Sequence, residues 1–435
     1  MKLMPPHKNI QVDYLSAADT RRQPKNDRLE EGWLHQLFLI THSLTTWPAW
    51  KLAVGLLALA ALVGLAWLPL GQVAVTAAAI YLGFALTDWI LLSWLPASHR
   101  SYGPIGPQLL VLTTPRLVVA LLPGLVGGLF GGSNLFWLTL LALLQAIGTA
   151  IYLWATLYEP FALGLTHKTI RSPSLNGKTP PIRLLHLSDL HVERLTAREA
   201  DLMQKIRQTK PDIIAITGDY LNLSYVDDPL ARTEVRRMLA ELQAPLGIYA
   251  TLGSPPVDPR LSTPSLFDGL DNIRLLRDEA AIISLPGGAT LSLLGLDCSH
   301  TPDIDGEVFR QLEQLIPANS TRVLLYHSPE LMPLVQQYPV DLYLCGHTHG
   351  GQVRLPLYGA VLTSSVLGKQ YEMGEYTEQN TTLYISRGIG LEGLSAPRMR
   401  LLCPPEIILF TLEGGGVSHL PSKPGDAGKF EQAQD

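Results

Sequence analysis

Charged side chains are scarce in this sequence. Asp, Glu, Lys and Arg make up 16% of its 435 residues, against roughly 25% in an average soluble protein. The shortage is local, because residues 52–87 and residues 117–158 contain none of the four. Soluble folds rarely expose such apolar runs, whereas a membrane-spanning helix needs about 20 predominantly apolar residues. We therefore expect four spans, which we place at 51–70, 73–95, 109–131 and 135–157.

Cysteine is also scarce. Cys298, Cys345 and Cys403 show neither the spacing of a metal site nor the even count of a disulfide framework. We expect three buried thiols in a reducing compartment. The formal net charge is −5, so composition gives no argument for nucleic-acid binding.

The basic residues indicate how the spans are oriented. Six Lys or Arg precede the first span and others follow the last, whereas the turns near Gly71 and Gly132 have none. The positive-inside rule then places both termini in the cytoplasm. We expect a multi-pass protein of the inner (cell) membrane, with its larger domain on the cytoplasmic side. Asp88 and Arg116 fall at or within spans, where a charge is often functional; we favour the alternative, that they are helix-end residues or form a mutual ion pair.

The second half alternates short apolar runs with amphipathic stretches, which predicts an α/β layered fold. We expect strands at 182–187, 212–217, 247–252, 289–296, 322–327, 341–345, 382–386 and 406–412, and helices at 196–209, 228–242 and 306–316. The resulting division is a cytoplasmic N-terminal segment (1–47), a transmembrane helical domain (48–158), a linker (159–181), the α/β domain (182–413) and a disordered tail (414–435).

Polar residues collect where these strands end. They are Asp189, His191, Asp219, His327, His347 and His349. Any one of them is more often a turn residue or an ordinary histidine than a ligand. Together, two Asp and four His at strand ends suit a divalent ion such as Mn, Fe or Zn. Two ions about 3.5 to 4 Å apart can share a carboxylate and a hydroxide, an arrangement suited to displacement at phosphorus.

These motifs resemble the calcineurin-like metallophosphoesterase superfamily. The shared features are Asp189-x-His191, Gly218-Asp219, His327 and Gly346-His347-x-His349, in that order. The resemblance covers about residues 182–413. With the N-terminal spans, the chain looks like the membrane-anchored bacterial branch, whose relatives include pyrophosphatases acting on a UDP-linked acyl sugar. The implied fold is a four-layer α-β-β-α sandwich, here preceded by an all-α transmembrane domain of about four helices.

The resemblance also implies a two-ion centre. Asp189, His191 and His349 would bind one ion, His327 and His347 the other, and Asp219 would bridge the two. A bridging hydroxide would attack phosphorus in line, which makes Asp219 and His327 part of the catalytic set. The implied partners are the membrane and a phosphodiester or pyrophosphate substrate, for which membrane anchoring makes a lipid-linked compound plausible.

One family motif is altered. After the third strand the family has G-N-H, where the Asn completes the shell of the second ion and the His assists the leaving group. This chain has Gly253, Ser254 and Pro255. Ser254 can bind the ion only weakly or leave the position to water, and Pro255 cannot transfer a proton. Loss of such acid catalysis typically costs about 10² to 10⁴ in rate.

Three hypotheses follow. The favoured one is a working hydrolase whose leaving group needs little protonation. A nucleoside monophosphate or an aryl phosphate would be such a leaving group. His300, just past another strand, is the candidate to replace the lost His, although an ordinary loop His is the more common case. The second hypothesis is a non-catalytic module that binds metal or phosphate. The third is a one-ion site with slow or altered activity.

Overall fold

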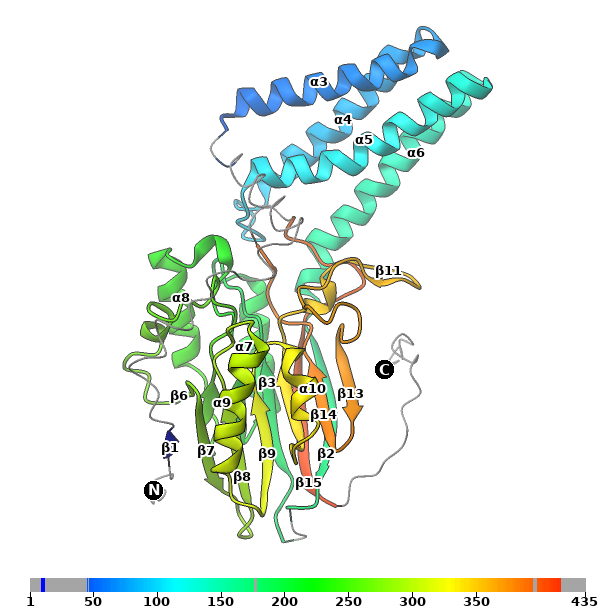
Figure 1. Cartoon of the computed structure of the whole chain (residues 1–435). Helices are drawn as coiled ribbons and strands as arrows, with labels where there is room; N and C mark the ends of the chain where they lie inside the picture. The colour runs from blue at the N-terminus through cyan, green and yellow to red at the C-terminus, as the bar shows by residue number, and fades with distance from the viewer. Residues whose placement is uncertain (1–8, 12–44, 46, 176–177, 394–396, 416–435) are drawn as a thin grey trace.

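A computed structural model describes residues 9–11, 45, 47–175, 178–393 and 397–415. Four long helices form one end of the molecule, and an α/β domain forms the other (Figure 1). Most of the expected N-terminal segment and nearly all of the expected disordered tail lie outside the described residues, and so do the six basic residues that precede the first span.

Four long apolar helices lie where the sequence predicts the four spans. The helices are α3 (Ala49–Trp67), α4 (Val73–Trp94), α5 (Ile105–Phe130) and α6 (Asn134–Leu153). Short helical turns extend the first and last of them, so the four apolar segments are Ala49–Leu70, Val73–Trp94, Ile105–Phe130 and Asn134–Phe161. Each is long enough to cross the apolar core of a bilayer. Many of their leucines face outward, as expected for helices surrounded by lipid.

Asp88 and Arg116 form a buried ion pair between α4 and α5. Nη2 of Arg116 lies 2.6 Å from Oδ1 of Asp88, and its Nε also donates to that carboxylate. Gln145 and Thr149 of α6 accept two further hydrogen bonds from the guanidinium, each 2.9 Å long. All of these groups satisfy one another within the helix bundle, so the mutual ion pair is the correct one of the two structural alternatives.

Two sheets form the α/β domain. The first contains seven strands in the order β1 (Asn9–Gln11), β7 (Glu279–Ser284), β8 (Thr290–Gly295), β9 (Ser320–Leu325), β10 (Leu342–Cys345), β14 (Thr381–Ile385) and β13 (Gly374–Glu378). The second contains six in the order β2 (Gly164–Ser172), β15 (Glu406–Gly414), β3 (Ile182–Leu187), β4 (Ile213–Ile216), β5 (Ile248–Ala250) and β6 (Ile273–Leu275). Both sheets mix parallel and antiparallel pairs.

The sheets face each other and carry helices on their outer faces. Leu184 of β3 packs in the core between the sheets, while its neighbour Leu185 packs against α7 (Ala197–Thr209) and α8 (Pro229–Ala240). On the other side, α9 (Pro302–Gln314) and the short α10 (Met332–Val335) cover the seven-stranded sheet. Strands buried on both faces explain the continuous apolar runs in the sequence. The four-layer sandwich is confirmed.

Capping residues define where the helices begin. Thr196 and Glu199 form the capping box that starts α7, in which the Glu199 carboxylate accepts a hydrogen bond of 2.8 Å from the Thr196 amide. Asp228 caps α8 by accepting from the Ala231 amide at 2.8 Å. α9 begins at Pro302, four residues before the start that we expected.

The stretch 159–181 is not simply a linker. It contains β2, which pairs in parallel with β15 from Gly164 to Ser172 along the edge of the six-stranded sheet. One face of β2 is exposed over most of its length, so the strand contains polar residues and its sequence resembles a linker. Strands β1, β6, β7 and β13 were also missed, as was a small two-stranded hairpin within residues 354–360.

Candidate metal centre

The strands bring all of the predicted ligands to one end of the sandwich. Asp189, Asp219 and Ser254 follow β3, β4 and β5, which run parallel. His327 follows β9, and His347 and His349 follow the parallel neighbour β10. Because the carboxyl ends of parallel strands meet at the same edge, these side chains converge, and all of them are buried.

The backbone at this edge is unusual. Asp189, His191, Asp219, His347 and His349 all have φ between 39° and 68°, a left-handed region that residues other than glycine rarely adopt. Such conformations cost on the order of 1–3 kcal/mol each and cluster at ligand-binding sites. The glycine at 346 is required by packing, because a Cβ there would overlap the Asp189 carboxylate.

Asp189, His191 and His349 form the first cluster. Nε2 of His191 lies 2.9 Å from Nε2 of His349, which in turn lies 3.4 Å from Oδ1 of Asp189. One donor atom from each residue lies within 4.8 Å of the others. The second oxygen of Asp189 is buried without a hydrogen-bond partner among the described residues. Two facing imidazole nitrogens beside a carboxylate suit a shared cation.

Asp219 lies between this cluster and the next. Its Oδ2 is 3.5 Å from Nε2 of His191 and 3.3 Å from Nε2 of His327. Its other oxygen accepts a hydrogen bond of 2.8 Å from the Ser254 amide. Asp219 therefore has the position of a bridging carboxylate.

His327 and His347, whose ring centroids lie 5.1 Å apart, form the second cluster, and each is held by a backbone carbonyl group. Nδ1 of His327 hydrogen-bonds to the Thr217 carbonyl at 2.7 Å, which leaves its Nε2 without a hydrogen-bond partner in the described structure. Nε2 of His347 bonds to the Ser364 carbonyl at 2.7 Å, and its Nδ1 lies 3.4 Å from the Ser254 hydroxyl. Such bonds fix the tautomer and direct the free nitrogen at a metal.

Burial controls the protonation of the cluster. Desolvation raises the pKa of Asp189 to about 7 against the opposing charge of His327, and it raises the pKa of Asp219 to about 6 against that of His191. Desolvation also lowers the pKa of His347 and of His349 well below the ordinary value. The site therefore contains neutral imidazoles beside carboxylates that are costly to ionise, which a divalent cation would relieve.

Ser254 and His300 lie together beside the second cluster. Nε2 of His300 is 3.0 Å from the Ser254 hydroxyl, and the His300 ring stacks on the ring of His347 with centroids 4.5 Å apart. Pro255 is partly exposed at the start of the following turn.

Three acidic residues at the site have no signature in the sequence. Oε2 of Glu392 lies 3.5 Å from Nε2 of His191 and 3.6 Å from that of His349. Oε2 of Glu330 lies 3.5 Å from Nδ1 of His300. Asp258 accepts hydrogen bonds of 2.7 and 2.8 Å from the amides of Asp219 and Gly253, which holds two ligand loops together.

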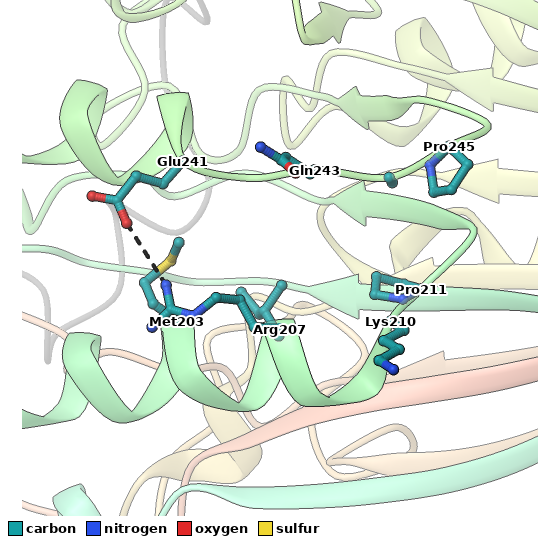
Figure 2. A pocket seen from close by; sticks show the side chains of 9 residues that line it. Met203, Arg207, Lys210, Pro211, Glu241, Gln243 and Pro245 are labelled. Carbon is teal, nitrogen blue, oxygen red and sulfur yellow. Dashed lines mark ion pairs between the residues drawn. The ribbon is translucent and has the colours of Figure 1, made fainter. Parts of the chain in front are cut away.

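A groove elsewhere on the domain is separate from this site. Figure 2 shows its lining between α7 and α8, where Arg207 and Glu241 form an ion pair of 3.8 Å. Lys210 and Pro211 precede β4, and Pro245 precedes β5. The groove therefore lies at the opposite ends of those strands from Asp219 and Ser254.

Comparisons with known proteins agree with this geometry. A family model described as calcineurin-like phosphoesterase matches residues 182–351. The chain is 30% identical over 273 residues to the uncharacterized metallophosphoesterase YkuE of Bacillus subtilis, covering 60% of this chain and 90% of that protein. It is 24% identical over 316 residues to the UDP-2,3-diacylglucosamine pyrophosphatase LpxG of Chlamydia trachomatis, covering 59% of this chain and 92% of that protein. It is 28% identical over 239 residues to the phosphodiesterase YaeI of Escherichia coli, covering 53% of this chain and 82% of that protein.

The matched region contains every Asp and His of the two clusters, and the relatives are covered over most of their length. With four helices that can cross a membrane at its N-terminal side, the chain belongs to the calcineurin-like metallophosphoesterase superfamily of metal-dependent phosphoric ester hydrolases.

Proposed function

We propose that this protein is a membrane-anchored phosphoesterase that hydrolyses a phosphodiester or pyrophosphate in a lipid-linked substrate. The observation that carries the proposal is the convergence of two Asp and four His, all buried, at the strand ends of a domain fixed to four apolar helices. We place this domain on the cytoplasmic side of the inner membrane, as the distribution of basic residues in the sequence favours.

The geometry supports the ligand assignment that the resemblance implies. Asp189, His191 and His349 would hold one divalent ion, His327 and His347, whose ring centroids lie 5.1 Å apart, the second, and Asp219 would bridge them. Bound ions of this kind polarise a phosphoryl oxygen and stabilise the charge that develops during displacement. The Thr217 and Ser364 carbonyl groups keep His327 and His347 oriented. The His and carboxylate set suits Mn, Fe or Zn.

Contacts between the anchor and the α/β domain support a substrate at the membrane. The Tyr102 amide, in the loop between α4 and α5, donates to Glu193 at 2.9 Å. Gln108 of α5 accepts a hydrogen bond of 3.3 Å from the amide of Arg398, whose Nε donates to the same Glu193 carboxylate at 2.6 Å. Glu193 follows closely after His191, so the metal centre lies next to the cytoplasmic ends of the spans in this orientation. The relative LpxG, whose name describes a diacylated nucleotide sugar as its substrate, supports the same substrate class.

Pro255 favours a good leaving group. No side chain at that position can protonate a departing oxygen, so an alkoxide would leave slowly. A nucleoside monophosphate released from a pyrophosphate leaves as a stable anion and needs less help. We therefore favour a pyrophosphate over a simple alkyl phosphodiester.

The test uses the full chain purified in detergent with added Mn²⁺. Bis-p-nitrophenyl phosphate and a lipid-linked nucleoside diphosphate are supplied in parallel. We expect turnover of both that Asp219→Asn abolishes and that His167→Ala, an exposed change on β2, leaves intact. Metal binding without turnover of any phosphodiester or pyrophosphate would instead favour the non-catalytic module. In that case the double change Ser254→Asn and Pro255→His should create activity.

A further inference from the structure

Beside the second cluster lies an imidazole that the superfamily pattern does not include. His300 follows β8 and is buried. Its Nε2 points at Ser254, the residue that stands where the pattern has Asn. Its ring stacks on His347, a proposed ligand of the second ion. The short Ser254 side chain leaves the space that the His300 ring approaches.

Glu330 holds this imidazole from behind. The carboxylate is buried, and its Oε2 lies 3.5 Å from Nδ1 of His300 with no hydrogen bond among the described residues. Its other oxygen accepts a hydrogen bond of 3.2 Å from the Val366 amide. A carboxylate on one ring nitrogen orients the other nitrogen toward a metal.

We propose that His300, oriented by Glu330, ligates the second ion in place of the missing Asn. This proposal rests on the two-ion centre of the proposed function. One ring nitrogen of His300 and one of His347 lie within 4.8 Å of each other, close enough to serve one ion. His300 then repairs metal binding rather than proton transfer, and the centre keeps two ions despite Ser254.

Metal content tests the proposal independently of turnover. Wild type, His300→Ala and the control His167→Ala are purified as full chains, equilibrated with Mn²⁺ and assayed by elemental analysis. We expect a metal-to-protein ratio near two in wild type and in the control, and near one in His300→Ala. Glu330→Gln should keep the second ion but bind it about tenfold more weakly.

A rescue variant separates ligand loss from misfolding. Ser254→Asn combined with His300→Ala restores an amide to the second site, so the ratio should return to near two. A ratio of two in His300→Ala alone, a ratio of one in wild type, or failure of the rescue in a protein with unchanged circular dichroism would overturn the proposal. If the ratios behave as expected but no substrate turns over, the ligand assignment stands and the hydrolase proposal fails.

A separate surface feature lies close to the membrane helices. Strands β11 (Arg354–Leu355) and β12 (Gly359–Ala360) form a small hairpin. We call residues 354–366 the apolar hairpin, because residues 355–366 contain no charged side chain. Its exposed apolar residues are Leu355, Leu357, Tyr358, Val361, Leu362 and Val366. A patch of this kind marks an interaction site more often than an ordinary surface.

Hydrogen bonds place the base of the apolar hairpin beside the membrane anchor. The Arg354 amide donates to the Leu401 carbonyl at 2.9 Å, and the adjacent Arg400 amide donates to the carbonyl of Ala155 at 2.8 Å. Ala155 lies in the last apolar segment, Asn134–Phe161. In Figure 1 the hairpin extends from the end of the α/β domain that faces the helices.

We infer that the apolar hairpin inserts into the interfacial layer of the bilayer that holds the anchor. Continuity with the four spans favours lipid over a second copy or another protein. A cation beside the hairpin also fits an interface, since Nζ of Lys369 lies 3.5 Å from the centroid of the Tyr358 ring and donates to the Tyr358 carbonyl. The Ser364 carbonyl bonds to His347, so an inserted hairpin would hold the metal centre close to the lipid surface.

Site-directed fluorescence tests this insertion. The three native cysteines are buried, so a new cysteine can be labelled selectively with an environment-sensitive fluorophore. Leu357→Cys is compared with Leu315→Cys, an exposed position at the far end of α9, in the full chain within phosphatidylcholine and phosphatidylglycerol nanodiscs. We expect blue-shifted emission at 357 that doxyl-labelled lipid quenches, and neither effect at 315. Water-like emission at 357, or an apolar signal that labelled lipid does not quench, would overturn the inference.

Discussion

Metal affinity should depend steeply on pH, because the two carboxylates of the centre must ionise to bind. Burial raises the pKa of Asp189 to about 7 and that of Asp219 to about 6. At pH 5.5, about one thirtieth of Asp189 and about one quarter of Asp219 are ionised. At pH 7.5, about three quarters of Asp189 and nearly all of Asp219 are ionised. The fraction of protein with both groups ionised therefore rises about 100-fold across this range.

The sign is fixed by the direction of the shifts. A raised carboxyl pKa means that the metal-free fold prefers the protonated form, so its stability falls as pH rises from about 4 toward 7. Bound cations prefer the ionised form, so their affinity rises over the same range. The histidines at 347 and 349 contribute little, because burial lowers their pKa well below the ordinary value.

The assay is a Mn²⁺ titration of chelator-stripped protein, with free Mn²⁺ followed by electron paramagnetic resonance. We expect affinity about 100-fold weaker at pH 5.5 than at pH 7.5. Asp189→Asn removes the contribution of Asp189, so the difference should shrink to the roughly fourfold contribution of Asp219. Equal affinity at both pH values, or tighter binding at the lower one, would refute the reasoning.

Three further predictions concern the altered motif, the anchor and one helix cap. Ser254→Asn with Pro255→His should raise kcat by about 10² to 10⁴ for a substrate with an alkyl leaving group. Steady-state assays should show little gain for a substrate that releases p-nitrophenolate. Equal gains for the two substrates would argue against lost acid catalysis. Asp88→Asn should destabilise the anchor by about 3–5 kcal/mol because Arg116 loses its buried partner, whereas replacing both by Leu should cost much less. Unfolding of the anchor in detergent can be followed by the emission of the eight tryptophans, all between residues 33 and 154. Equal losses of stability in Asp88→Asn and in the double Leu variant would contradict the prediction. Thr196→Ala should cost about 1 kcal/mol through the lost cap of α7, measured as faster labelling of the three buried cysteines in denaturant; an unchanged rate would count against the cap.

The layered fold could be predicted because most of its strands are buried on both faces. Runs such as 182–187 and 406–412 are continuously apolar, and the structure has strands at both. Two of the missed strands are of another kind. β2 and β13 lie at sheet edges with partly exposed side chains, so neither has the apolar run that would distinguish a strand from a loop.

The site was only partly visible in the sequence for a similar reason. Asp189 and His191 lie two residues apart, and so do His347 and His349, which leaves a recognisable spacing. Glu330 and Glu392 reach the centre from separate loops, and their roles depend on contacts with residues far away in the chain. No local pattern records such a contact. The sequence did show that Ser254 replaces Asn, but the approach of Glu330 to His300 required the structure.

The hydrogen bonds that join the α/β domain to the helices also determine how the enzyme would meet its substrate. Glu193 and the amides of Arg398 and Arg400 tie the domain to the anchor at several points, so the metal centre would stay at one height above the bilayer instead of swinging on a tether. An enzyme held in this way samples molecules by lateral diffusion in a single leaflet. Its rate would then follow the mole fraction of substrate in the membrane, and diluting that substrate with inert lipid would slow the reaction even when the total amount in the vessel is unchanged.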